Sequence, residues 1–257
     1  MKRVVIYISC FLMVAACAPT VSNTSLSYGN KAELERRAEL RMQRASAYYS
    51  EGQYATALSE LDQALQTGER RADVLGLRGL VLMQLGNSEA ASKNLQQALQ
   101  IEPENPDLLN NFGWFLCETG QAERSLPFFD RAVSTKTYQS PAKALMNSGR
   151  CSMKLGQRGA SENYFQRVLQ IDPEQIGAHA SLAKLSYGSS DFKRARRHLL
   201  QVITSARAKP EVFLMAIAVE RQLGDKLAEE SIALQWRKRF PDAVLSGTSS
   251  PGLVDER

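Results

Sequence analysis

The 257-residue chain has little of what catalysis and metal binding usually require. It contains two histidines, His179 and His198, which lie 19 positions apart and have no further ligand at the spacing of a metal site. No Ser-His-Asp arrangement, His-Glu-x-x-His helix, GxGxxG turn or phosphate-binding loop occurs. We therefore expect the chain not to be an enzyme and to need no cofactor. The two histidines are expected to be packing and surface residues.

Strong charge of one sign is also absent. There are 32 basic and 27 acidic residues, with a net charge of +5 at pH 7, and no basic stripe with interleaved aromatics that would indicate nucleic-acid binding. The densest basic run, Arg194 to Arg197 before His198, is typical of a solvated helix face. Contact with lipid head groups is its alternative interpretation.

No apolar run is long enough to cross a membrane, which takes about 20 residues. The longest, 4–16, has 13 residues and follows Lys2 and Arg3, as in an export signal. Its end, Val-Ala-Ala-Cys at 14–17, resembles the lipobox of bacterial lipoproteins. The resemblance implies cleavage before Cys17 and a covalent lipid on that residue; an ordinary signal cut after Ala16, leaving a free thiol, is the alternative.

The residue after this cysteine is Ala18, whereas many lipoproteins retained in the inner membrane have Asp there. The lipobox resemblance therefore implies an outer-membrane protein, anchored by lipid and facing the periplasm. Residues 18–30 are polar and show no helical or strand period, which indicates a flexible tether.

What the chain does contain is a repeat of about 34 residues. Its pattern is clearest in 72–105, where large and small apolar residues recur three and four apart and Pro103 closes the unit. The residue at the turn between the two helices of each unit recurs at intervals of 34, 34, 36, 34 and 34: Gly52, Gly86, Gly120, Gly156, Ser190 and Gly224. The period, the small packing residues and the closing proline resemble the tetratricopeptide repeat.

This resemblance implies an all-α fold, a superhelix of about six helix pairs whose first helices line a concave face. The expected organisation is a signal peptide at 1–16, a lipid-anchored tether at 17–37, a repeat domain at 38–243 and a disordered tail at 244–257. The units are 38–71, 72–105, 106–141, 142–175, 176–209 and 210–243. The sixth departs from the pattern at Ile217, Glu220, Glu229 and Ala233, as expected of a terminal cap.

The 36-residue interval marks an irregular junction between the third and fourth units. It is flanked by NNFGWFLC at 110–117 and by ALMNSGRC at 144–151, with Pro141 near the start of the second helix. Together with the lipobox and the six units, this block resembles the type IV pilus biogenesis and stability lipoproteins (PilF/PilW type). That resemblance implies a pilotin, which escorts the pilus secretin to the outer membrane and promotes its multimerisation.

Two cysteines would remain in the mature chain after Cys10 is removed and Cys17 is acylated. Cys117 and Cys151 lie on first helices of adjacent units, and the periplasm permits disulfides. We expect a disulfide between them, with Gly113 and Gly149 letting the two helices approach closely. Two buried thiols acting as small apolar residues are the alternative.

Partner binding is expected on the concave face of units two to four. In this interpretation side-chain amides bond to a peptide backbone and Trp114 is an aromatic anchor. Alternatively, Trp114 and Met146 are core residues and the asparagines bond within the stack. The candidate contacts are Leu80, Met83, Gln84, Asn110, Trp114, Met146, Asn147 and Arg150.

The expected function is therefore binding. We expect a monomer whose partner is the secretin subunit and whose lipid anchor holds it at the outer membrane. The alternative is a repeat adaptor on the same scaffold that serves barrel assembly or cell-wall enzymes.

Overall fold

The computed structural model describes residues 23–66 and 71–242, which form twelve α-helices and no β-strand. The predicted all-α class is therefore confirmed. The helices make six antiparallel pairs: α1 (Asn23–Ser50) with α2 (Tyr54–Leu65), α3 (Ala72–Gln84) with α4 (Ser88–Ile101), α5 (Pro106–Glu118) with α6 (Ala122–Ser134), α7 (Pro141–Lys154) with α8 (Arg158–Ile171), α9 (Ile176–Gly188) with α10 (Phe192–Ile203), and α11 (Pro210–Leu223) with α12 (Lys226–Arg239).

The residue at the turn within each pair has the left-handed backbone conformation. Its φ lies between 60° at Ser190 and 79° at Gly120, and the other four units have glycine there. This conformation lets amides beyond the helix reach back to its last carbonyls; after α3, Gly86 and Asn87 bond to Met83 and Leu82 at 3.0 and 2.9 Å. Ser190, which must tolerate the steric cost of a side chain, keeps the same turn.

Prolines set other helix limits. Helices α4, α8 and α12 end two residues before Pro103, Pro173 and Pro241, the predicted closing prolines. Pro141 is the first residue of α7, so the fourth unit begins one residue earlier than the predicted boundary.

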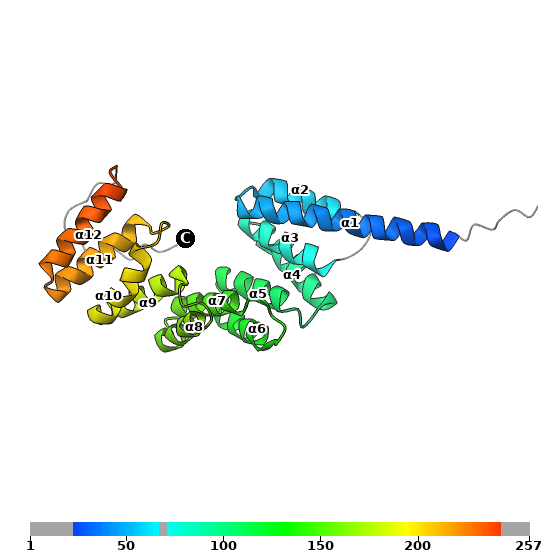
Figure 1. Cartoon of the computed structure of the whole chain (residues 1–257). Helices are drawn as coiled ribbons and strands as arrows, with labels where there is room; N and C mark the ends of the chain where they lie inside the picture. Colours follow the sequence, from blue (N-terminus) through cyan, green and yellow to red (C-terminus); the bar gives the residue numbers. More distant parts are fainter. Residues whose placement is uncertain (1–22, 67–70, 243–257) are drawn as a thin grey trace, which may run out of the picture.

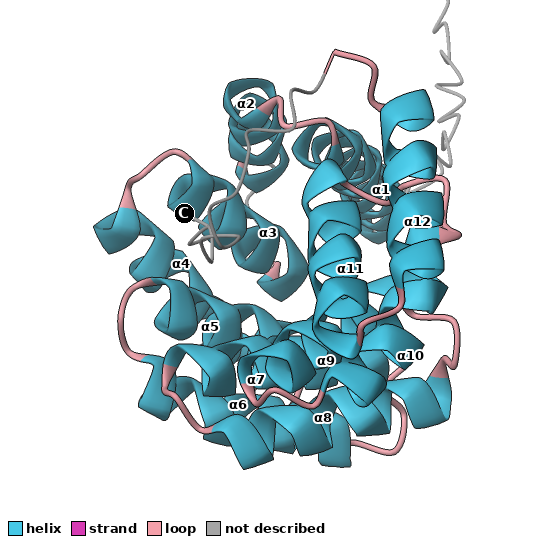
Figure 2. Ribbon diagram, turned by 90° about the vertical axis from the view of Figure 1, so that its left-hand side faces the viewer, coloured by secondary structure: helices cyan, strands magenta, loops and turns pink. Residues whose placement is uncertain are grey.

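The six pairs stack into an open arc, as Figure 1 shows. The odd-numbered helices line its concave side and the even-numbered helices form its convex side, which the second view also shows (Figure 2). The first five pairs each bury a small residue of the first helix against a large residue of the second, because neither helix could shield its apolar face alone.

Three glycines illustrate this packing. A Cβ added to Gly79, Gly113 or Gly149 would lie 2.5–2.8 Å from a side-chain atom of Leu95, Phe129 or Phe165, respectively. Each large partner belongs to the second helix of the same unit. The expectation that Gly113 and Gly149 bring α5 and α7 together is therefore wrong: these glycines make room for phenylalanines within their own pairs.

The amino-terminal end differs from the predicted tether at 17–37, because α1 already begins at Asn23. From Lys31 onward the segment consists of strong helix formers, and side chains four apart pair, with Glu33 and Arg37 at 2.9 Å. The signal peptide at 1–16, the lipidation of Cys17 and the tail at 244–257 lie outside the described residues. Within the described ranges, no helix is long and apolar enough to span a membrane.

The sixth unit departs from the repeat for a visible reason. Glu220 is only 3% exposed, and Arg196 of the preceding unit bonds to both of its carboxylate oxygens. In units two and three the equivalent position, four residues before the turn, holds the buried leucines Leu82 and Leu116. The last pair is thus attached through this ion pair in addition to an apolar cluster that includes Leu199 and Phe213.

Candidate partner-binding surface

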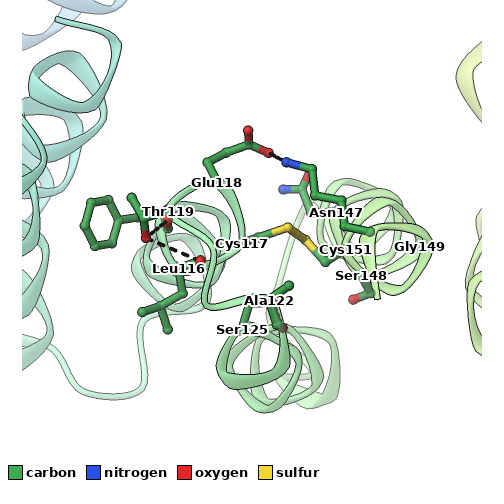
Figure 3. Close-up of a disulfide and its surroundings, with 12 residues drawn as sticks. Leu116, Cys117, Glu118, Thr119, Ala122, Ser125, Asn147, Ser148, Gly149 and Cys151 are labelled. Carbon is green, nitrogen blue, oxygen red and sulfur yellow. Dashed lines mark hydrogen bonds and ion pairs between the residues drawn. A yellow bond between two sulfur atoms is a disulfide. The ribbon is translucent and has the colours of Figure 1, made fainter. Parts of the chain in front are cut away.

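Helices α5 and α7 are joined by a disulfide. Cys117 and Cys151, the pair expected from the sequence, have their Cα atoms 5.8 Å apart, and both side chains are buried. Figure 3 shows the bond passing between the two helices, with Asn147 beside it on α7. The covalent link fixes neighbouring first helices at the centre of the arc.

An amide pair lies on the same two helices. The side-chain nitrogen of Asn147 donates to the side-chain oxygen of Asn110 at 2.9 Å, and Asn110 in turn donates to Asn111 at 3.4 Å. Asn110 is 1% exposed. Because a buried amide is costly without partners, this pair serves the stack itself, the alternative that the sequence left open for Asn110.

Trp114 is half-buried beside the disulfide, where it packs against the cluster that contains Cys117 and Cys151. The ammonium group of Lys154 lies 5.9 Å from the centre of its ring and 2.8 Å from a carboxylate oxygen of Glu118. One side of the Trp114 ring therefore packs against the core, and the other side is covered by the long side chain of Lys154. A partner's apolar residue could displace that lysine without disturbing the core.

The other predicted contacts divide by exposure. Leu80 is buried, Met83 and Met146 are half-buried against core clusters, and Gln84 and Arg150 are exposed. Fewer of the predicted contact residues are therefore accessible than expected. Those that are partly or fully exposed are Met83, Gln84, Trp114, Met146, Asn147 and Arg150.

Counting back from the turn residue adds Lys184, which the sequence interpretation missed, to a row with Trp114 and Arg150. The residue six before the turn is Trp114 in α5, Arg150 in α7 and Lys184 in α9, and the residue nine before it is Asn111, Asn147 or Ser181. Residues three apart lie on one helix face, so each helix presents a hydrogen-bonding group next to a ring or a cation. Neither Arg150 nor Lys184 has an ion-pair partner in the part of the chain that the structure describes. The repeat interval itself could have revealed this row.

The two histidines form a pair that the sequence did not predict. Their Nδ1 atoms are 3.0 Å apart, and Nε2 of His179 lies 2.9 Å from the carbonyl oxygen of Pro173. Burial, followed by the nearness of His179 and of Arg194 and Arg197, lowers the pKa of His198 to about 4. Because His179 is buried and both of its ring nitrogens have partners, we assign the pair a role in packing. No group of three or more potential ligands for a metal occurs among residues 23–66 and 71–242.

Comparison with known proteins agrees with this architecture. Family models described as TPR repeat and tetratricopeptide repeat match residues 79–114 and 142–175. The fold is a tetratricopeptide-repeat solenoid. No curated protein gives a significant sequence match to the chain.

Several solved structures resemble this solenoid closely. PilW, described as a widely conserved type IV pilus biogenesis factor, is 26% identical, with a TM-score of 0.71 over 80% of this chain and 94% of PilW. PilF of Pseudomonas aeruginosa is 20% identical, with a TM-score of 0.72 over 82% and 95% of the two chains. A tetratricopeptide repeat protein from Parabacteroides merdae is 16% identical, with a TM-score of 0.58 over 87% and 88%. The similarities to PilF and to the Parabacteroides protein concern the fold alone.

Proposed function

We propose that this solenoid is an outer-membrane lipoprotein of type IV pilus biogenesis that binds the pilus secretin subunit and promotes its localisation and multimerisation. The observation that carries the proposal is the similarity to PilW, which extends over nearly all of that protein. The lipobox at 14–17 supports an anchor on Cys17 facing the periplasm. The protein acts as a monomer, by binding instead of chemistry, and needs neither nucleic acid nor a cofactor.

The secretin-binding surface in this proposal is the concave side of α5, α7 and α9. Trp114 offers a ring, and Asn147 offers the amide groups that its bond to Asn110 leaves unused. Arg150 and Lys184 offer two charges without ion-pair partners in residues 23–66 and 71–242. These groups match an extended peptide segment with an apolar residue followed by acidic residues, because the amide can bond to the peptide backbone. Membrane-anchored copies that each hold one subunit raise the local subunit concentration and so favour ring assembly.

The test uses a deletion strain complemented with single variants, with heat-stable secretin multimers as the measurement. Deletion leaves the secretin monomeric, and Arg150→Glu lowers multimer yield several-fold because it reverses a charge without touching the core. Gln166→Glu, an equally exposed change on the convex side of α8, leaves the yield unchanged. Normal multimers in the deletion strain would overturn the proposal.

Co-purification separates this function from its competitor. The lipidated protein, solubilised from envelopes, should retain secretin, and Trp114→Ala should weaken retention while the helical circular dichroism is unchanged. Recovery of barrel-assembly proteins or cell-wall enzymes in place of secretin would support the other adaptor role.

A further inference from the structure

The convex side of the solenoid changes character along the arc. Ten residues after the turn, the outward position is Gln96, Asp130 and Gln166 in units two to four, but Leu200 and Leu234 in units five and six. Three residues after the turn the sequence changes in the same direction, from Glu89 and Glu123 through Gly159 to Lys193 and Leu227. Equivalent positions therefore carry polar or acidic side chains in the middle of the molecule and basic or apolar ones near its end.

Leu227 is the most exposed large apolar side chain of the described residues, while Leu200 and Leu234 are about as accessible as Ile101 and Ile171 at the ends of α4 and α8. Leu200 is 47% exposed on α10, while Leu234 and Leu227 are 53% and 81% exposed on α12. They stand singly on helix surfaces, since their neighbours on the same faces are polar. A stable solenoid gains nothing from large apolar side chains in water.

Basic side chains surround these leucines. Lys193, Arg197, Lys226, Arg237 and Lys238 are exposed, and none has an ion-pair partner within the described ranges. Arg194 and Arg196 of the same region form ion pairs with Glu162 and Glu220, respectively. Glu230, between Leu227 and Leu234, is the exposed carboxylate on this face of α12. The net charge of the face therefore remains positive.

Helices α10 and α12 both pack against α11, and one side chain links their ends. Arg239, in the last turn of α12, donates to the carbonyl oxygens of Ile203 and Ser205 at 3.4 and 2.7 Å, at the end of α10. Both views show these two helices on the outer side of the arc (Figures 1 and 2). We call the exposed leucines and free cations of α10 and α12 the basic convex patch.

We propose that the basic convex patch binds the surface of an anionic lipid bilayer. A convex face can meet a planar membrane, whereas the concave side cannot. Separate leucines among lysines and arginines suit the boundary between head groups and acyl chains, where the leucines enter and the cations stay at the phosphates. A partner helix would instead need a continuous apolar stripe, and Glu230 interrupts the one on α12.

The contact would orient the arc. An anchor near the amino terminus fixes one end only, while the patch lies in the last two units and would draw the convex side of the other end to the bilayer. The concave side would then remain open to the periplasm. The proposal does not depend on the secretin-binding function, because lipid alone is the ligand.

The experiment uses the full chain in two variants, Leu234→Trp and Gln96→Trp, which each add one tryptophan at the same repeat position, in units six and two. The unmodified chain, which contains only Trp114 and Trp236, gives the background that is subtracted from both. Each is added to vesicles of phosphatidylglycerol and phosphatidylethanolamine containing brominated lipid, which quenches a nearby indole. We expect fluorescence to fall at least twofold more for Leu234→Trp than for Gln96→Trp. The difference should shrink in phosphatidylcholine vesicles and at high salt, which screens charges.

Charge reversal tests the role of the cations. Each basic residue at an anionic surface contributes about 1 kcal/mol, a factor of about five in binding, so Lys193→Glu with Arg197→Glu should abolish the extra quenching of Leu234→Trp. Lys93→Glu, at the position of Arg197 in unit two, is the matched control and should change nothing. Equal quenching of the two reporters, or extra quenching that survives the double reversal, would overturn the proposal. These vesicles contain no secretin, so the result is independent of the multimer assay.

Discussion

The junction between units three and four and the junction between units five and six are held by different forces. The first uses a disulfide and a neutral amide pair between α5 and α7. The second uses Arg196, which binds the buried Glu220 of α11 and, at 3.1 Å, the carboxylate of Asp225. The comparison teaches that one repeat geometry can be fixed by covalent, amide or ionic contacts, with different sensitivity to redox state, charge and pH.

Breaking the junction between units three and four should cause the largest loss in the free energy of unfolding. Cys117 and Cys151 are separated by 34 residues, and a loop of that size predicts a loss of about 3–4 kcal/mol when the bond is removed. The double variant Cys117→Ala with Cys151→Ala should therefore unfold at much lower urea concentration, followed by circular dichroism. Reductant should lower the stability of the unmodified protein and leave that of the variant unchanged; an unmodified protein indifferent to reductant would refute the assignment.

Breaking the carboxy-terminal junction should cost less. Arg196→Leu leaves the carboxylate of Glu220 buried without its partner, and we expect a loss of about 2 kcal/mol. This lies below the cost for fully buried pairs because the Arg196 side chain is 33% exposed. Urea unfolding measures the change.

The control for that variant is Arg221→Leu, which removes an exposed pair with Glu229 and should alter stability by less than about 1 kcal/mol. Adding Glu220→Leu to Arg196→Leu supplies the residue found at this position in units two and three and should restore most of the lost stability. Failure of this rescue would show that the ionic contact is not what distinguishes the last unit.

The hydrogen bond between Asn110 and Asn147 should make a smaller contribution to the stability of the junction between units three and four. Asn147→Ala removes the donor to Asn110, and we expect a loss of about 1 kcal/mol, typical of one hydrogen bond to a buried group. Thermal unfolding with the disulfide intact measures it. Asn163→Ala, an exposed site on α8, should have almost no effect; a similar loss at both sites would argue against a specific role for the pair.

A further effect should appear only in acid and only in the carboxy-terminal half. The folded protein lowers the pKa of His198 to about 4, while an unfolded histidine titrates near 6.5. Between these values the unfolded chain binds more protons, so stability is complete above about pH 6.5 and declines as pH falls toward 4. His198→Gln should flatten this part of the profile of melting temperature against pH; an unchanged slope would show that other groups cause it.

Much of the fold could be predicted because the repeat depends on residues that act on the backbone near their own positions. Gly52, Gly86 and Ser190 mark turns through one backbone conformation, and Pro103 or Pro173 closes a helix whatever surrounds it. Cys117 and Cys151 could be paired by counting repeat units. The start of α1 at Asn23 was missed because the polar residues before Lys31 give no periodic signal.

The candidate surface was less predictable. Asn110, Asn147 and Trp114 occupy similar helix faces in sequence, yet the structure buries the first, pairs it with the second and leaves the third half-exposed. Helical periodicity gives the face on which a residue lies, but not how far the neighbouring helix covers it.

The sequence by itself determined the number of helix pairs, their turns and the alternation of small and large residues within each pair, because all three depend on interactions within about 34 residues. Only the tertiary structure decided that Glu220 meets Arg196 and that His179 meets His198. Those partners depend on the angles at which helices cross within and between units. Such angles are set by the combined packing of many side chains and are not encoded at any single position.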